Sequence, residues 1–270
     1  MDVDRLRQDA AAVLADGRAR MVIGFRDRAG DRVPAFITDA EQAGELLYDE
    51  ACRQNPAAYL KKAELKRFRP VAIVARPAVM RSLVLLAAEA QVADEDVLVL
   101  GVSDDDAYHG ILDLAATAAL LNEKYAEIPH DPDLVKRIEE ISAMTPEERS
   151  GFWTEQFARC TRCYACRAAC PMCYCTQCIV EKNVPQWIST AAAGHGNYAW
   201  NIIRAFHLAG RCTECGACEA ACPQGIPLML LNVVLARDVQ EEFGVKVGYD
   251  AEAEPVIGSW RPDDNEDFIR

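Results

Sequence analysis

The sequence lacks the features that mark two common classes of protein. It has no excess of basic residues: 29 Lys and Arg stand against 42 Asp and Glu, which gives a formal net charge of −13. Binding to a nucleic-acid backbone requires clustered positive charge. Its longest apolar runs, such as Ser82–Ala90, fall well short of the roughly 20 residues of a membrane-spanning helix. We therefore expect no nucleic-acid partner and no membrane span.

The sequence also lacks a nucleotide fingerprint and a secretory leader. No G-x-G-x-x-G follows a predicted strand, and no P-loop is present. The first twenty residues mix charged side chains such as Asp2, Arg5 and Asp9 with short apolar groups, so they lack the apolar centre of a signal peptide. We expect a cytoplasmic protein, in which cysteines stay reduced and serve metals or catalysis more often than disulfides.

Cysteine is the residue that the chain has in abundance. Eleven of the twelve cysteines lie between positions 160 and 222, where two blocks share the spacing C-x2-C-x2-C-x3-C followed by proline. The first block is Cys160, Cys163, Cys166 and Cys170 before Pro171, and the second is Cys212, Cys215, Cys218 and Cys222 before Pro223. In bacterial ferredoxins each such block gives three thiolates to one 4Fe–4S cluster and its fourth to the other.

The spacing therefore predicts two 4Fe–4S clusters with exchanged fourth ligands. The predicted ligands are Cys160, Cys163, Cys166 and Cys222 for cluster 1, and Cys212, Cys215, Cys218 and Cys170 for cluster 2. The alternative is a pair of zinc sites, since C-x2-C pairs also build zinc ribbons. Zinc gives no reason for four cysteines in each block with a proline after both, so iron–sulfur is favoured.

Local charge favours the same interpretation. Between Gln156 and Arg211 there are six basic residues and one acidic residue, Glu181, in a chain that is otherwise strongly acidic. Nearby cations would stabilise the net negative charge of thiolate-bound clusters. The alternative is that these are ordinary solvated arginines and lysines.

Four cysteines fall outside the two blocks. Cys173, Cys175 and Cys178 follow the first block directly and could give three thiolates to a third cluster, with Cys52 as its fourth ligand. The alternative is that Cys52 is a small buried hydrophobe and that the other three are redox or supporting thiols. His195 and His207 could also ligate a cluster, although a packing or hydrogen-bonding role is favoured for both.

The pattern of apolar residues predicts an α+β protein. Residues 1–128 are expected to form a small α/β domain with helices near 4–14, 39–48, 78–91 and 107–125 and strands near 21–25, 33–38, 71–74 and 97–102. The strand–helix alternation predicts a small parallel sheet. Residues 129–150 are expected to form a linker, 151–240 a mostly helical dicluster ferredoxin-like domain, and 241–270 an acidic tail lying over a surface or a partner. Thr145, Pro146 and Glu148 predict a helix start.

Several stretches resemble a known family. Arg162-Cys163-Tyr164-Ala165-Cys166-Arg167, Cys170-Pro171-Met172-Cys173-Tyr174-Cys175 and His207-Leu208-Ala209-Gly210-Arg211-Cys212 resemble iron–sulfur subunits related to the beta subunits of formate dehydrogenase and of deazaflavin-coenzyme-reducing hydrogenase. Cys52, Asn55 and Tyr59-Leu60 match the family's Cys-x2-Asn-x3-Tyr-Leu segment. The chain departs from the family at Ala78 and at Ser103-Asp104, where members commonly carry cysteine, so a third cluster would be altered or absent.

The resemblance implies an electron-transfer subunit of a larger oxidoreductase, of the kind found with heterodisulfide-reductase-like complexes. Its partners would be other redox subunits that contain flavin or metal, and its own part would be to carry single electrons rather than to catalyse bond chemistry. We find no residues that would carry over a flavin site, so FAD is not expected. Two alternatives stay open: a flavin-containing subunit that reduces a soluble acceptor, and a zinc-stabilised interaction module.

Overall fold

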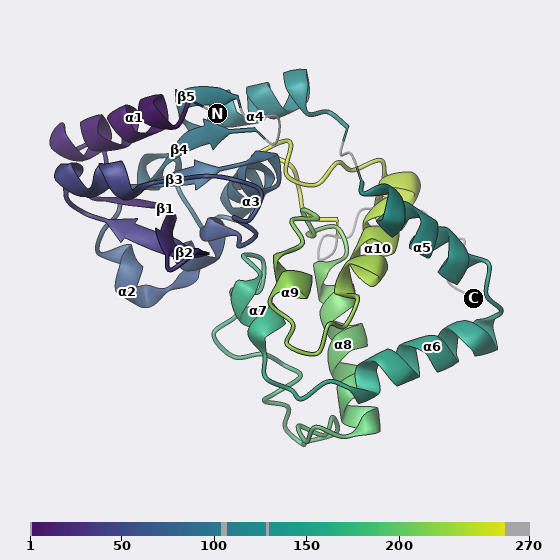
Figure 1. Ribbon diagram of the computed structural model, residues 1–270. Helices are drawn as coiled ribbons and strands as arrows, with labels where there is room; N and C mark the ends of the chain where they lie inside the picture. The colour runs from purple at the N-terminus through teal and green to yellow at the C-terminus, as the bar shows by residue number, and fades with distance from the viewer. Residues whose placement is uncertain (1, 104–106, 128–129, 257–270) are drawn as a thin grey trace.

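The computed structural model describes residues 2–103, 107–127 and 130–256, and these form a sheet-containing N-terminal part and a helical C-terminal part (Figure 1). The two parts meet at the short helices α7 and α9, which lie between the sheet and the long helices α8 and α10. This architecture confirms the predicted α+β fold.

The N-terminal part is built on a five-stranded mixed sheet with the order β2-β1-β3-β4-β5. Its strands are β1 (Met21–Arg28), β2 (Asp31–Ile37), β3 (Val71–Ala75), β4 (Val97–Val102) and β5 (Tyr108–Leu112). The three inner strands β1, β3 and β4 are parallel, and every residue of β3 is buried. This burial explains the continuous apolar runs, since parallel strands are covered on both faces. The two edge strands are antiparallel; the turn-rich residues between β1 and β2 predict the hairpin that these two strands form, whereas β5 was not predicted as a strand.

Helices cover both faces of this sheet (Figure 1). One face packs against α1 (Val3–Ala15) and the 3-10 helix η1 (Ala40–Glu45). The other packs against α3 (Pro77–Ala88), α4 (Leu114–Lys124) and the 3-10 helix η2 (Pro56–Lys61). Two short elements, α2 (Ala63–Lys66) and η3 (Asp94–Asp96), complete this part.

Two predicted helices differ from the structure. The helix expected from Asp39 to Tyr48 is a 3-10 helix that ends at Glu45, although Asp39 does cap it by accepting a hydrogen bond from the Glu41 amide. The helix expected from residue 107 begins at Leu114, because Tyr108–Leu112 pairs with β4 as an edge strand.

The C-terminal part contains two long helices and four shorter ones among the described residues. They are α5 (Pro132–Ser142), α6 (Pro146–Ala158), α7 (Ala165–Ala169), α8 (Gly194–Leu208), α9 (Ala217–Ala220) and α10 (Leu228–Phe243). Residues 129–150, expected to form a linker, therefore include the whole of α5. The predicted start of α6 is confirmed, because Thr145 and Glu148 form a reciprocal capping box with Pro146 at the first helical position. No helix of the described residues is long and apolar enough to cross a membrane.

The chain returns to the sheet after α10. Val247 and Tyr249 are buried against the core that α3 and α4 share with the sheet, and Arg81 of α3 donates from Nε to the Val247 carbonyl at 2.9 Å. The first half of the expected acidic tail thus packs on the α/β part, whereas residues 257–270 lie outside the described residues.

Gly248 is the tightest point of this return. Its φ is +78°, and an added Cβ would lie 2.4 Å from the Arg81 carbonyl oxygen. Gly17 has a similar φ of +75° but open space around it. We expect Gly17→Ala to cost roughly 1 kcal/mol through the left-handed backbone, and Gly248→Ala to cost about 1–3 kcal/mol more through the clash.

Thermal unfolding of anaerobically prepared protein measures this difference. About 2–4 °C of melting temperature corresponds to each 1 kcal/mol in a chain of this size class. Equal melting temperatures for the two variants would show that residues 245–249 are not held against α3.

Candidate metal centre

The two cysteine blocks fold into matching loops. In each loop the third and fifth residues have left-handed backbone conformations, with φ of 57° at Arg162, 59° at Tyr164, 56° at Glu214 and 74° at Gly216. In each loop the third residue also turns its amide back onto the first thiol. Arg162 N donates to Cys160 Sγ and Glu214 N donates to Cys212 Sγ, both at 3.4 Å. The repeated spacing therefore produces a repeated geometry.

A short helix follows each loop and carries the fourth cysteine away from the first three. The helix α7 runs between Cys163 and Cys170, and α9 runs between Cys215 and Cys222. These two helices pack against each other between the loops. The last cysteine of each block thereby reaches the loop of the other block.

Two small cavities result, each with about 20 Å³ of free space and each lined by four cysteines. One is lined by Cys160, Cys163, Cys166 and Cys222. The other is lined by Cys170, Cys212, Cys215 and Cys218. The structure thus brings together each of the two sets of four that the sequence predicts. Apolar side chains such as Trp200 and Leu228 in the first cavity, and Met172 and Met229 in the second, close the walls.

Four thiols line each cavity. A 4Fe–4S cluster places its irons and sulfides between four thiolates, and the cysteines of each cavity supply that number of ligands. The residues present therefore fit two 4Fe–4S clusters.

Burial makes the thiolate form costly unless metal or positive charge compensates it. Burial raises the pKa of Cys218 to about 12 and raises the pKa of Cys166 and of Cys212 as well. The side-chain amide of Asn232, itself buried, donates to Cys218 Sγ at 3.6 Å. Since metal ligation requires the thiolate, a bound metal and nearby positive charge would stabilise the charged form of these cysteines.

Arg204 of α8 supplies positive charge between the two cavities. Its side chain is 5% exposed, it donates from a terminal nitrogen to the Cys166 carbonyl at 3.1 Å, and its Nε has no hydrogen-bond partner in the described part of the chain. Burial acts to lower its pKa, but the thiols of Cys173, Cys170 and two further cysteines raise it above the ordinary value. No carboxylate of the described residues pairs with it, so the thiolates are its counter-charge.

Arg162 plays a similar part beside the first loop. It is 6% exposed and donates to the Gly196 carbonyl at 2.7 Å, while its Nε and its other terminal nitrogen lack partners among the described residues. The rings of Tyr164 and Trp200 lie under its guanidinium at 5.6 and 5.4 Å. Asn197, also of α8, fixes the same loop by donating to the Cys160 carbonyl at 2.7 Å.

The α/β part holds the end of the first block with one lysine. Lys61, at the end of η2, donates from Nζ to the carbonyls of Arg167, Cys170 and Cys173 at 3.1, 2.7 and 3.3 Å. Burial lowers its pKa. Three carbonyls around one ammonium group fix the turn in which the first block ends.

The α/β part also holds the second loop. Arg76 donates to the Cys215 carbonyl at 3.0 Å, and Arg81 donates to the Thr213 carbonyl at 3.2 Å. The hydroxyls of Ser82 and Thr213 lie 2.8 Å apart, and Asn55 donates to Ser82 at 2.9 Å. The loop therefore rests on the start of α3.

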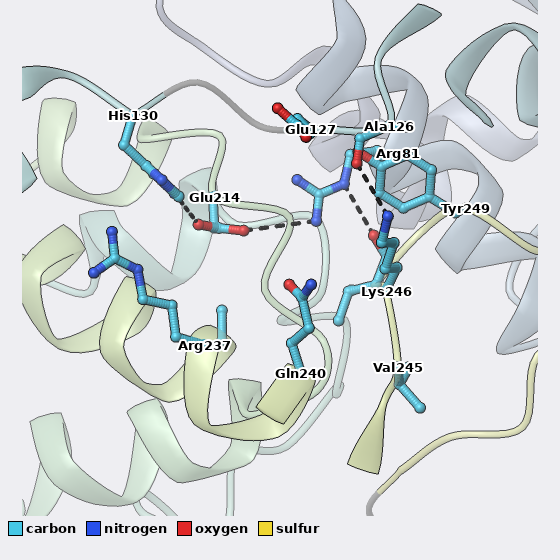
Figure 2. Close-up of a pocket in the computed structure, with 12 residues that line it drawn as sticks. Arg81, Ala126, Glu127, His130, Glu214, Arg237, Gln240, Val245, Lys246 and Tyr249 are labelled. Carbon is cyan, nitrogen blue, oxygen red and sulfur yellow. Dashed lines mark hydrogen bonds and ion pairs between the residues drawn. The ribbon is translucent and has the colours of Figure 1, made fainter. Parts of the chain in front are cut away.

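Figure 2 shows the two side chains that pair with the Glu214 carboxylate of the second loop. Glu214 lies between His130 and Arg81, at 2.6 Å from His130 Nε2 and 3.7 Å from the Arg81 guanidinium. The three side chains line a cavity of about 370 Å³ together with residues of α10 and of the segment that returns to the sheet. The loop thus carries no unpaired buried acid.

The four remaining cysteines do not come together. Cys52 is buried, and its thiol donates toward Asp49 Oδ1 at 3.7 Å; burial raises its pKa to about 11. Cys173, Cys175 and Cys178 line a separate cavity of about 440 Å³, whose lining does not include Cys52. This geometry matches the alternative in which Cys52 is a small buried side chain.

Sequence reasoning missed the cations of the α/β part that hold the loops. Lys61 and Arg76 lie more than eighty residues before the first block, and no local pattern sets them apart from the other basic residues. Arg204 was among the six basic residues whose local excess indicated compensation of negative charge, but only the fold shows that it is buried.

Comparison with known proteins agrees with this geometry. The family model described as a 4Fe-4S dicluster domain matches residues 159–227. The F420-dependent formate dehydrogenase subunit beta of Methanocaldococcus jannaschii is 31% identical over 105 residues, which cover 39% of this chain and 27% of the relative. The F420-dependent formate dehydrogenase 1 subunit beta of Methanococcus maripaludis is 31% identical over 110 residues, 41% of this chain and 28% of the relative.

The matches span little more than a quarter of the length of these relatives. They confirm the resemblance that the cysteine motifs indicated, and they confirm 4Fe–4S clusters as the cofactor.

The position of Arg204 leads to a prediction about reduction potential. Arg204→Gln should shift cluster potentials negative by roughly 50–150 mV, because a unit charge a few ångströms away is worth a few kcal/mol and about 59 mV corresponds to 1.4 kcal/mol for one electron. Arg204→Lys, which keeps the charge, should shift them less. Redox titration followed by electron paramagnetic resonance measures the potentials.

Arg159 provides the matched control, because it is an exposed arginine directly before Cys160. Water screens an exposed charge, so Arg159→Gln should change the potentials little. Equal shifts in the Arg204→Gln and Arg159→Gln variants would contradict a special role for the buried guanidinium.

Proposed function

We propose that this iron–sulfur protein, related to the beta subunits of formate dehydrogenases, relays single electrons through two 4Fe–4S clusters as a subunit of a larger oxidoreductase. Its partners are other redox subunits that contain flavin or metal. The cluster 1 ligands are Cys160, Cys163, Cys166 and Cys222, and the cluster 2 ligands are Cys212, Cys215, Cys218 and Cys170.

The observation that carries this proposal is the pair of four-cysteine cavities. Each contains three cysteines of one block and the fourth of the other, as expected for exchanged ligands in a dicluster ferredoxin. Chance packing of eight cysteines would not divide them in this way. Helix α7 contributes Cys166 to one cavity and α9 contributes Cys218 to the other, and these two helices pack against each other, so the sites are neighbours.

The protein's own contribution is placement and electrostatics. Bound 4Fe–4S clusters supply the one-electron chemistry. Arg204 and Arg162 place buried positive charge beside the thiolates, which favours the reduced state, and the Arg162 and Glu214 amides donate to sulfur. The apolar walls exclude water, which strengthens each of these interactions.

The named relatives are subunits of formate dehydrogenases, which supports a role within a complex. The chain's α/β part has no nucleotide fingerprint, and its Lys61, Arg76 and Arg81 donate to backbone carbonyls of the cysteine loops. We therefore assign it the role of supporting the cluster loops and docking to partner subunits.

The exchange of fourth ligands can be tested directly. Cys222→Ser should disturb cluster 1, the same cluster that Cys163→Ser disturbs, although residue 222 belongs to the second block. Cys170→Ser should disturb cluster 2, as Cys215→Ser does. Each variant should lose up to about four irons relative to the parent, given four irons per cluster, and electron paramagnetic resonance identifies which signal is lost.

Cys52→Ser is the control, since Cys52 lies apart from both cavities, and it should keep the iron content of the parent. If Cys222→Ser and Cys215→Ser abolished the same signal, each block would hold its own cluster and the assignment of ligands would be wrong.

The role as a subunit predicts specific partners. A tagged copy of the chain, purified anaerobically from its native source, should bring with it stoichiometric proteins that contain flavin, molybdenum, tungsten or further iron. The clusters should become reduced when the donor substrate of that complex is added. Stoichiometric flavin bound to the chain itself, purified alone, would instead support a flavin-containing enzyme; zinc without iron or acid-labile sulfide would support an interaction module.

A further inference from the structure

Three thiols and one imidazole that neither proposed cluster uses line a single cavity. Cys173, Cys175 and Cys178 come from the loop after the first block, and His207 comes from the last turn of α8. The cavity has a volume of about 440 Å³, far more than the 20 Å³ of each four-cysteine cavity. The site therefore has both donors and room.

Three arginines line this cavity. Arg211 is paired with Glu89, and Arg167 is paired with Glu181. Arg204 is 5% exposed and has no carboxylate partner among the described residues. Its charge acts on Cys173 of this cavity as well as on thiols of the two four-cysteine cavities, so it would help to compensate an anionic group bound here.

The chemistry of the donors indicates which group would bind. Thiolates are soft ligands that select iron–sulfur clusters, zinc or copper(I). The cavity leaves room between the donors for a cluster. The spacing Cys-x-Cys-x2-Cys delivers three thiolates from one loop, and imidazole replaces thiolate as an iron ligand in some iron–sulfur centres.

We propose that this cavity holds a third iron–sulfur centre, with Cys173, Cys175, Cys178 and His207 as its ligands. The fourth ligand is His207 rather than Cys52, which is buried elsewhere against Asp49. The proposal rests on the two-cluster function and adds a third redox centre to the electron-transfer path.

The centre lies against both of the other sites. The Cys173 amide donates to the carbonyl of Cys170, a proposed ligand of cluster 2, at 3.3 Å. Cys178 packs against the same buried apolar residues, around Trp200, as Cys160 and Cys166, which are proposed ligands of cluster 1. Cys175 and His207 are exposed. The third centre is thus accessible from solvent, where a partner subunit would exchange electrons with it.

Iron counting on the full chain, purified anaerobically, tests the proposal. The parent should contain about twelve irons, on four per cluster. Cys175→Ser should contain about eight and keep the signals of clusters 1 and 2, whereas the matched variant Cys52→Ser should keep about twelve. A loss of iron in Cys52→Ser but not in Cys175→Ser would overturn the assignment.

The histidine ligand has its own test. His207→Ala should lose the third centre. His207→Cys should keep about twelve irons but lower the potential of one centre, because imidazole ligation raises potentials relative to thiolate. His195→Ala, a change at the other end of α8, should alter neither the iron content nor the potentials.

The outcomes separate this proposal from the two-cluster function. A parent with about eight irons, with Cys173, Cys175 and Cys178 open to alkylation, would overturn the third centre and leave the two clusters standing. Twelve irons in His207→Ala would overturn the histidine ligand. Fewer than eight irons in the parent would count against the two-cluster function itself.

Discussion

The arrangement of the cysteine loops depends on cationic side chains that donate hydrogen bonds to backbone carbonyls. Lys61, Arg76 and Arg204 all donate to carbonyls of the two cysteine blocks or of the residues directly beside them. A carboxylate partner would fix these side chains equally well but would cancel their charge. A carbonyl fixes the position of the cation and leaves its charge free to act on nearby thiolates. The same contacts therefore hold the loops in place and compensate their negative charge.

The repeat of two cysteine blocks is preserved at the level of backbone conformation but not of side chains. Left-handed residues occur at equivalent positions, although one of the four is glycine and the others are Arg162, Tyr164 and Glu214. Left-handed conformations are costly for such residues, so the surrounding structure must hold them. The difference in side chains makes the two sites unequal: the first loop carries a buried arginine, whereas the second carries a buried glutamate paired with Arg81 and His130.

The sequence predicts correctly those elements that are determined by residues close together in the chain. The capping box at Thr145 and the apolar strands at Val71 and Val97 were predicted within a residue or two, and so was the grouping of the cysteines that line each cavity. The strand Tyr108–Leu112 was missed because it is fixed by pairing with β4 and by the hydrogen bond from the Tyr108 hydroxyl to Asp9. Distant contacts of this kind override local propensity. The position of Cys52 likewise depends on packing. Dividing twelve cysteines into three sets of four grouped Cys52 with Cys173, Cys175 and Cys178, but the fold places it away from them.

Two positions at the carboxyl side of the sheet bear on the resemblance to the related family. The resemblance leads us to expect cysteine where this chain has Ala78 and Asp104, and Asp104 lies outside the described residues. Ala78 lies in the first turn of α3, and its carbonyl accepts a hydrogen bond from Ser82, which in turn contacts Thr213 of the second loop. Ser103 is buried and bonds to Ala107 at the end of β4. Ala78 and Ser103 thus make structural contacts near the carboxyl ends of β3 and β4, the edge at which an α/β sheet usually binds its ligand. In this chain Arg76 and Arg81 extend from the same edge to the second cysteine loop. This edge of the sheet therefore supports the second cysteine loop.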